Sequence, residues 1–129
     1  MLAKILLIED NEQNRYLVTF LLEKNGYQVV AAPDGPAGID LAEKERPALV
    51  LLDIQLPGMD GCAVARALRE NSSIASTPIV AVTSYAMLGD REKALASGCD
   101  GYMEKPINPD TFVSQVASYL HLQAADDTP

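Results

Sequence analysis

The chain has 129 residues, of which 18 are acidic and 10 are basic, so its formal net charge is −8 at neutral pH. This length suits one domain and is too short for two domains of ordinary size. The surplus of negative charge disfavours binding to nucleic acid, because the phosphates would be repelled. The apolar runs are far shorter than the roughly 20 residues that a membrane-spanning helix needs.

The cysteines and the start of the chain indicate the cellular compartment. Cys62 and Cys99 lie far apart and form no Cys-x-x-Cys pair, so neither a zinc site nor a disulfide framework is expected. The first residues run directly into an apolar segment of strand length, without the long apolar region and cleavage site of a secretion signal. These features favour the cytoplasm, where reduced cysteines are ordinary small residues.

Strand-like and helix-like segments alternate in the first part of the chain. An apolar run at residues 4–8 predicts a strand, and residues 12–24 follow with the apolar spacing of a helix. Residues 28–31 predict a second strand, and a second helix is expected from its N-cap at Asp34 to residue 46. The run at 48–52 is apolar throughout, as expected for a central strand covered on both faces.

The same alternation continues to the C-terminal region. A third helix is predicted at residues 64–70, a fourth strand at 78–82 and a weaker helix at 90–97. A short strand at 101–104 precedes a last helix at 109–120. Parallel strands need crossover connections that helices provide, so the alternation predicts an α/β fold whose sheet has helices on both faces.

Two places are expected to be less stable than the rest. Gly38 lies inside the second predicted helix, where glycine weakens helical structure. Residues 123–129 are polar, small and acidic, and are expected to form a frayed, flexible tail. The domain is therefore expected to span residues 1–122.

Polar and charged residues follow four of the predicted strands. Because the carboxyl ends of parallel strands meet at one edge of a sheet, these residues are expected to lie close together, where ligands bind in such folds. They are Glu9 and Asp10 after the first strand, Asp53 after the third, Thr83 and Ser84 after the fourth, and Lys105 and Pro106 after the fifth.

Three carboxylates in one place need a compensating cation. Two carboxylates about 4 Å apart repel each other by roughly 4 kcal/mol at an effective dielectric constant near 20. Oxygen ligands without histidine or cysteine favour Mg²⁺. Asp53 could then be a metal ligand alone, or a nucleophile towards a phosphoryl group. Asp10 alone could have a simpler role as the cap of the first helix.

Four motifs resemble the receiver domain of two-component response regulators, over residues 4–122. The motifs are the acidic pair in 8–11, the segment Leu51–Gly61, the segment Val80–Ser84, and the segment Gly101–Ile107. Each is weak alone, but four in this order at the ends of strands are specific. The resemblance implies a flavodoxin-like (βα)5 fold, a three-layer sandwich with strand order 2-1-3-4-5.

The resemblance also implies a phosphoacceptor. Asp53 would accept a phosphoryl group from a histidine of a sensor kinase or a histidine phosphotransfer protein. Asp10, Asp53 and the backbone carbonyl of Gln55 would bind Mg²⁺ directly, and Glu9 would bind it through water. Lys105 would pair with Asp53 and then with a phosphoryl oxygen.

The switch residues are implied in the same way. Thr83 would hydrogen-bond another phosphoryl oxygen, and Tyr102 would swing inward into the space that Thr83 leaves. Lys105–Pro106 would be a cis peptide. The output would be contact with a downstream target protein, not enzymatic turnover beyond Mg²⁺-dependent self-phosphorylation and self-dephosphorylation. A stand-alone regulator and a receiver excised from a larger hybrid protein both remain open.

Three other functions compete with this interpretation. An aspartyl phosphatase would be expected to carry a second aspartate two positions beyond Asp53, where this chain has Gln55. A flavin mononucleotide carrier would need a phosphate-binding loop after the first strand, where Glu9 and Asp10 would repel the ligand. The third is a receiver-like adaptor that binds its partner independently of phosphorylation. Such an adaptor has no physical reason to keep like charges together.

Overall fold

Strands and helices alternate along the whole chain in a computed structural model of the protein, which describes residues 3–54, 56, 60–72, 74–83, 90–105 and 107–126. The strands in this described part are β1 (Lys4–Ile8), β2 (Gln28–Ala32), β3 (Leu49–Asp53), β4 (Ile79–Thr83) and β5 (Gly101–Glu104). The helices are α1 (Glu12–Lys24), α2 (Gly35–Glu45), α3 (Gly61–Glu70), α4 (Asp90–Ala96) and α5 (Phe112–Asp126). Each of these elements was predicted, with shifts of a few residues at its ends that are largest for α5.

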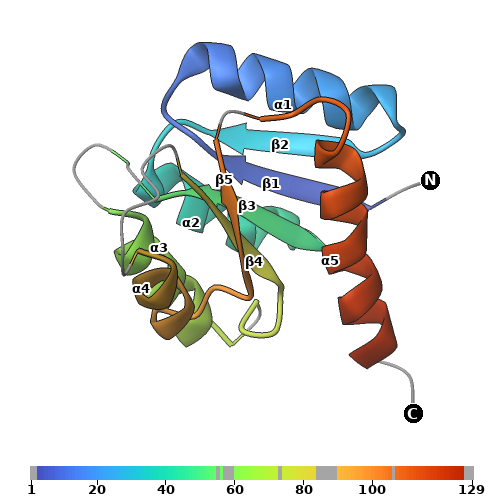
Figure 1. The fold of residues 1–129 in the computed structure, drawn as a ribbon. Helices are drawn as coiled ribbons and strands as arrows, with labels where there is room; N and C mark the ends of the chain where they lie inside the picture. The colour runs from blue at the N-terminus through green and yellow to red at the C-terminus, as the bar shows by residue number, and fades with distance from the viewer. Residues whose placement is uncertain are drawn as a thin grey trace.

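The strands form one parallel sheet in the order β2-β1-β3-β4-β5. Helices α1 and α5 cover one face of this sheet, and α2, α3 and α4 cover the other (Figure 1). The three-layer α/β sandwich and the strand order are therefore confirmed. Strands β1 and β3 are neighbours at the centre, so the segments that follow them emerge side by side.

Alternate residues of the strands belong to two separate cores, because successive side chains of a strand point to opposite faces. The core beneath α1 and α5 contains Ile5, Leu7, Leu49, Leu51, Val80 and Val82, together with Val18, Leu22, Phe112 and Val116 from the helices. The core on the other face contains Leu6, Ile8, Val50, Leu52, Ile79 and Ala81, together with Ala42, Val64, Leu68 and Ala94. Burial on both faces explains why β3 and β4 are apolar almost throughout.

Side-chain caps fix where three helices begin. Asn11, Asp34 and Asp60 each accept a hydrogen bond from the backbone N–H three residues later, at 2.9 Å in every case. The cap expected at Asp34 is confirmed. The cap of α1 is Asn11 and not Asp10, so capping does not explain the carboxylate of Asp10.

Gly38 is a site of close packing. It is buried on α2, and a Cβ atom at this position would lie 2.4 Å from Cδ1 and 2.7 Å from Cγ1 of Ile8. The absence of a side chain therefore lets α2 approach β1 closely. Glycine lowers the stability of the helix itself, but it allows the helix to pack more closely against the sheet.

The last helix begins and ends later than expected. A turn precedes it, in which the backbone N–H of Asp110 donates to Asn108 Oδ1 at 3.0 Å and that of Thr111 donates to the Asn108 carbonyl at 3.1 Å. Helix α5 then continues to Asp126. The tail expected over 123–129 is therefore helical as far as Asp126, which is consistent with the high helix propensity of glutamine and alanine in this stretch. Among the described residues, none of the helices combines the length and apolarity needed to cross a lipid bilayer.

Candidate functional site

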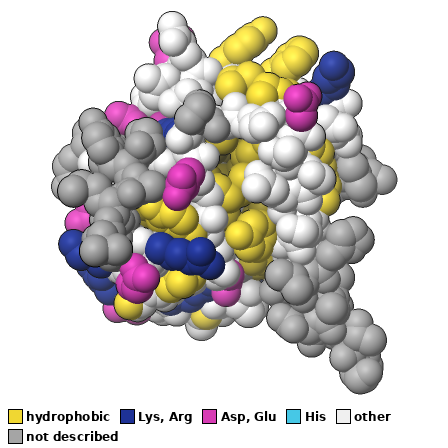
Figure 2. Space-filling model, in the orientation of Figure 1, with side chains coloured by type: hydrophobic (Ala, Val, Ile, Leu, Met, Phe, Trp, Pro, Cys, Tyr) yellow, Lys and Arg dark blue, Asp and Glu magenta, His cyan; other side chains and the backbone are white. Residues whose placement is uncertain are grey.

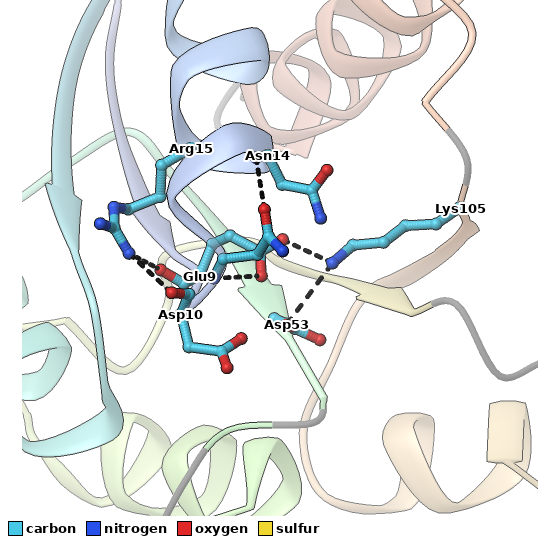
Figure 3. A network of polar contacts seen from close by, with 7 residues as sticks. Glu9, Asp10, Asn14, Arg15, Asp53 and Lys105 are labelled. Carbon is cyan, nitrogen blue, oxygen red and sulfur yellow. Dashed lines mark hydrogen bonds and ion pairs between the residues drawn. The ribbon is translucent and has the colours of Figure 1, made fainter.

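The predicted site residues converge at the carboxyl ends of the central strands. Glu9 follows β1, Asp53 is the last residue of β3, Thr83 is the last residue of β4, and Lys105 follows β5. The strand order brings these ends together, although Glu9 and Lys105 are 96 positions apart in the sequence. Figure 3 shows the side chains of Glu9, Asp10, Asp53 and Lys105 gathered at this edge.

Three carboxylates lie within reach of one cation. One carboxylate oxygen from each of Glu9, Asp10 and Asp53 lies within 4.8 Å of the others. Glu9 and Asp53 are buried, with only 3% and 6% of their surface exposed, whereas Asp10 is exposed at the mouth of the site. Carboxylate oxygens are the donors that a hard divalent cation prefers. The donor set therefore fits Mg²⁺.

Lys105 partly neutralises this cluster. Its Nζ atom lies 2.5 Å from Glu9 Oε1 and 3.5 Å from Asp53 Oδ2, and only 10% of its side chain is exposed. The predicted contact with Asp53 is present, but the contact with Glu9 is shorter by a full ångström. Lys105 is positioned through its backbone N–H, which donates to the carbonyl of Thr83 at 2.7 Å.

The pKa of Glu9 reflects opposing effects. Burial raises it, but a hydrogen bond with Asp53, the hydrogen bond and charge of Lys105, and the backbone N–H of Asn11 lower it, and the net result lies below the ordinary value. Glu9 is therefore an anion at neutral pH.

The floor beneath this site is apolar, with Leu51, Val82 and Phe112 among the residues that line the adjoining pocket.

Arg15 holds the loop that carries Glu9 and Asp10. Its Nη1 atom donates to the carbonyl oxygens of Glu9 at 2.8 Å and of Asp10 at 3.0 Å (Figure 3). The sequence contains one signal of this role. An arginine close to the N-terminus of a helix opposes the helix dipole, which suggests that another contact stabilises its position.

Thr83 and Tyr102 occupy neighbouring strands close to the site. Thr83 is buried, with 2% of its surface exposed, and it pairs with Glu104 across β4 and β5. Tyr102 pairs with Ala81 and is half-buried against the core beneath α2, α3 and α4. The remaining predicted residues, Gln55, Ser84 and Pro106, lie outside the described residues, as does the expected cis peptide before Pro106.

A parallel doubly wound sheet with three carboxylates and a lysine at its carboxyl edge defines the receiver class of signalling domains. The response regulator receiver domain family matches residues 5–117. The chain belongs to this family. Receiver domains of this family are signalling modules that bind Mg²⁺ in an acidic pocket and interact with histidine kinases or phosphotransfer proteins and with downstream targets.

Relatives and solved structures support this assignment. The chain is 38% identical over 120 residues to the polar-differentiation response regulator DivK of Brucella anthropi, covering 93% of this chain and 98% of that one. The structure is similar to chemotaxis protein CheY4 of Vibrio cholerae, with a TM-score of 0.88, 29% identity, and coverage of 92% of this chain and 99% of that one.

A third similar protein carries a metal ion. It is the receiver domain of sensor histidine kinase PA1611 from Pseudomonas aeruginosa, with a TM-score of 0.85 and 32% identity, covering 92% of this chain and 98% of that one. Its structure holds a magnesium ion coordinated in the active site cleft.

Proposed function

We propose that Asp53 accepts a phosphoryl group from a phosphohistidine of a sensor kinase or phosphotransfer protein, in a reaction that depends on Mg²⁺. One observation carries this proposal. The Lys105 ammonium lies between two buried carboxylates, Glu9 and Asp53, and a third carboxylate, Asp10, stands at the mouth of the site. With Mg²⁺ bound to the carboxylates, such a site would present two cations to a phosphoryl group that arrives from solvent.

The chemical step is a transfer between two nucleophiles. An oxygen of the Asp53 carboxylate bonds to phosphorus while the bond from phosphorus to the donor imidazole nitrogen breaks. A phosphoimidazole that is protonated on its second nitrogen leaves as neutral imidazole, so no further proton acceptor is needed. Hydrolysis of the acyl phosphate by water returns the Asp53 carboxylate and releases inorganic phosphate.

Positioning and charge neutralisation carry most of the catalysis in phosphoryl transfer. Asp10, Asp53 and the backbone carbonyl of Gln55 would hold Mg²⁺ directly, Glu9 would hold it through water, and the ion would neutralise phosphoryl oxygens. Lys105 would pair with a phosphoryl oxygen as a second cation. Thr83 would donate its hydroxyl to another oxygen, because it ends the strand next to the one that carries Asp53.

The new charge would then act on a protein-binding face. A phosphorylated aspartate carries more negative charge than the carboxylate, and this favours a rearrangement of neighbouring donors. Thr83 and Tyr102 lie on β4 and β5, which connect the site to α4 and α5. We assign the output to the surface at the β5 edge of the sheet, formed by α4, β5 and α5, with Tyr102 turning inward as Thr83 moves towards the phosphoryl group.

The donor protein would approach over α1, which begins beside the acidic loop. This helix exposes 74% of Tyr16 and 51% of Phe20, and their rings are stacked with centroids 6.4 Å apart. Figure 2 shows hydrophobic side chains standing out from the surface at this part of the molecule. Exposed aromatic residues of this kind are typical of protein contacts.

Incubation with acetyl phosphate, with and without Mg²⁺, tests the proposal. The intact chain is expected to gain the mass of one phosphoryl group when Mg²⁺ is present and none when it is chelated. Asp53→Asn is expected to abolish the gain. Asp60→Asn is the matched control, because Asp60 caps α3 and asparagine caps equally well. Labelling of Asp53→Asn to the same extent would refute the assignment to Asp53. A parent chain that gains no mass with Mg²⁺ present would instead favour a phosphorylation-independent adaptor.

A further inference from the structure

The exposed residues of α1 form a symmetric pattern. They lie in pairs, and the two members of each pair are equally far from residue 18, one before it and one after it. The pairs are Glu12 with Lys24, Gln13 with Glu23, and Tyr16 with Phe20. Every exposed residue of the helix belongs to one of these pairs, so the whole outer face of α1 shares one centre of symmetry.

The centre of this outer face is aromatic. Tyr16 and Phe20 are two of the three large hydrophobic side chains that are exposed in the described part of the chain. Their rings are stacked at an interplanar angle of 13°, and Nζ of Lys24 lies 5.9 Å from the centroid of the Phe20 ring. Figure 2 shows hydrophobic side chains at the top edge of the molecule, where α1 lies in Figure 1. Stacking orders the two rings before a partner arrives, and their apolar surface favours burial.

Two antiparallel copies of α1 would match the pairs with each other. In a twofold dimer each contact occurs twice, because residue i meets residue j and residue j meets residue i. With the axis at the level of residue 18, Tyr16 of one copy would meet Phe20 of the other. Glu12 would meet Lys24, and the amide of Gln13 could donate to the carboxylate of Glu23. The outer face of α1 is therefore complementary to itself.

The positions of the charges select the antiparallel arrangement. Glu12 is the first residue of α1 and Lys24 is the last. Parallel helices would place glutamate against glutamate and lysine against lysine, and like charges repel each other. Antiparallel helices turn both contacts into ion pairs and bring the N-terminus of each helix beside the C-terminus of the other, which also favours the two helix dipoles.

We propose that α1 binds a second copy of this chain through its outer face, as a weak twofold dimer. One helix from each copy makes a small interface, and the net charge of −8 on each copy opposes association, so the dimer should form only at high protein concentration. The dimer would cover the aromatic pair over which the phosphoryl donor approaches. Self-association and donor binding would then exclude each other, a consequence that rests on the proposed function.

Charge reversal tests the pairing. Sedimentation velocity measures the average mass of the parent, Glu12→Lys and Lys24→Glu as protein concentration rises. The parent is expected to approach twice the mass of the monomer. Each variant places like charges at both ends of the interface, and it is expected to raise the dissociation constant of the dimer about tenfold. An equimolar mixture of the two variants should recover association, because each end contact then joins a lysine to a glutamate.

The matched control is Lys44→Glu on α2, which covers the opposite face of the sheet. It changes the net charge as Lys24→Glu does, and it is expected to leave association at the level of the parent. Loss of association in Lys44→Glu would reveal an effect of net charge and overturn the proposal. A parent that stays monomeric, or a mixture that associates no better than the single variants, would also overturn it.

These outcomes are separate from those that test the proposed function. Acetyl phosphate needs no docking of a donor protein, so labelling of Asp53 does not require a free α1 surface. A chain that is labelled at Asp53 but stays monomeric would overturn the dimer and leave the proposed function intact. A chain that forms the dimer but is not labelled would support the dimer and count against the proposed function.

Discussion

Arg15 is linked to the acidic site through the backbone. Its guanidinium donates to the carbonyl oxygens of both Glu9 and Asp10, and it thereby fixes the loop on which two of the three carboxylates stand. The charge of the arginine is satisfied by carbonyl groups, so the carboxylates stay available for a metal ion. Arg15 therefore orients the loop that carries two of the proposed metal ligands.

Replacement of Arg15 tests this orientation. Arg15→Ala is expected to weaken Mg²⁺ binding about 3- to 10-fold, because hydrogen bonds of this kind contribute about 0.5–1.5 kcal/mol each. Calorimetric titration measures the effect. Arg66→Ala is the control, since Arg66 contacts Ser97 on the other side of the sheet. Unchanged affinity in Arg15→Ala would show that the loop keeps its shape without the guanidinium.

The buried thiol of Cys99 makes the free energy of unfolding depend on pH. Burial raises its pKa from an ordinary value of 9.0 to about 12, and the neighbouring groups modify this effect. The unfolded chain therefore loses the thiol proton at a lower pH than the folded chain does. Below pH 9 both states keep the proton, and above it the folded state is penalised increasingly up to about pH 12.

The free energy of unfolding should fall with rising pH in this window. The fall attributable to Cys99 is expected to reach about 1.4 kcal/mol per pH unit. Urea unfolding at several pH values between 9 and 12, for the parent and Cys99→Ala, measures the difference in slope. The variant should be less stable near neutrality, because it loses packing, but its stability should fall less steeply. Identical slopes would contradict a buried, protonated thiol.

At the scale of elements, the start of α3 packs against the backbone at the end of β3, where Asp53 lies. The backbone N–H of Gly61 donates to the carbonyl of Ile54, the residue directly after Asp53, at 2.8 Å. A Cβ atom at position 61 would lie 2.5 Å from Ile54 Cα and 2.7 Å from the Asp53 carbonyl oxygen. These are backbone atoms, so they cannot move aside without shifting the end of β3.

Gly61→Ala is therefore expected to lower the free energy of unfolding by about 1–3 kcal/mol, the usual range for overpacking. Gly38→Ala is the matched comparison, because the atoms nearest to a Cβ there are side-chain atoms of Ile8 and not backbone atoms. Denaturant unfolding compares the two variants. A smaller loss for Gly61→Ala than for Gly38→Ala would mean that the contact with the Asp53 backbone does not limit the packing.

Which segments form helices and which form strands could be predicted, because caps and apolar runs mark them clearly in the sequence. The cap at Asp34 and the apolar runs of β1, β3 and β4 are properties of short segments, and the structure confirms them. The bounds of α5 were wrong because the turn at Asn108 and the continuation to Asp126 depend on weak local preferences. The packing role of Gly38 was not predictable, because it depends on Ile8, which lies on a different element.

The candidate site follows the same rule. The convergence of Glu9, Asp10, Asp53 and Lys105 could be predicted because the carboxyl ends of parallel strands meet at one edge of the sheet. The detailed pairing could not be predicted, because the choice of Lys105 between Glu9 and Asp53 depends on side-chain length and conformation in three dimensions. Capping of α1 by Asn11 instead of Asp10 likewise depends on the backbone geometry at the end of β1.

At the scale of the whole molecule, the parallel sheet brings three carboxylates together at one edge of a protein that is already acidic. The net charge of −8 disfavours a site with three carboxylates unless cations compensate. Lys105 supplies one positive charge, and the proposed Mg²⁺ would supply two more. The strands β4 and β5 then connect this site to the edge of the sheet at β5, where α4 and α5 flank the strand on opposite sides.

The central claim is that residue 53 carries the phosphoryl group, and locating the modification tests it most directly. The chain is phosphorylated with acetyl phosphate and Mg²⁺ and reduced with borohydride, which converts an aspartyl phosphate into homoserine. Peptides are then mapped by mass spectrometry. Homoserine is expected at position 53 and at no other aspartate. Homoserine at a different position, or none in a chain that binds Mg²⁺, would contradict the account.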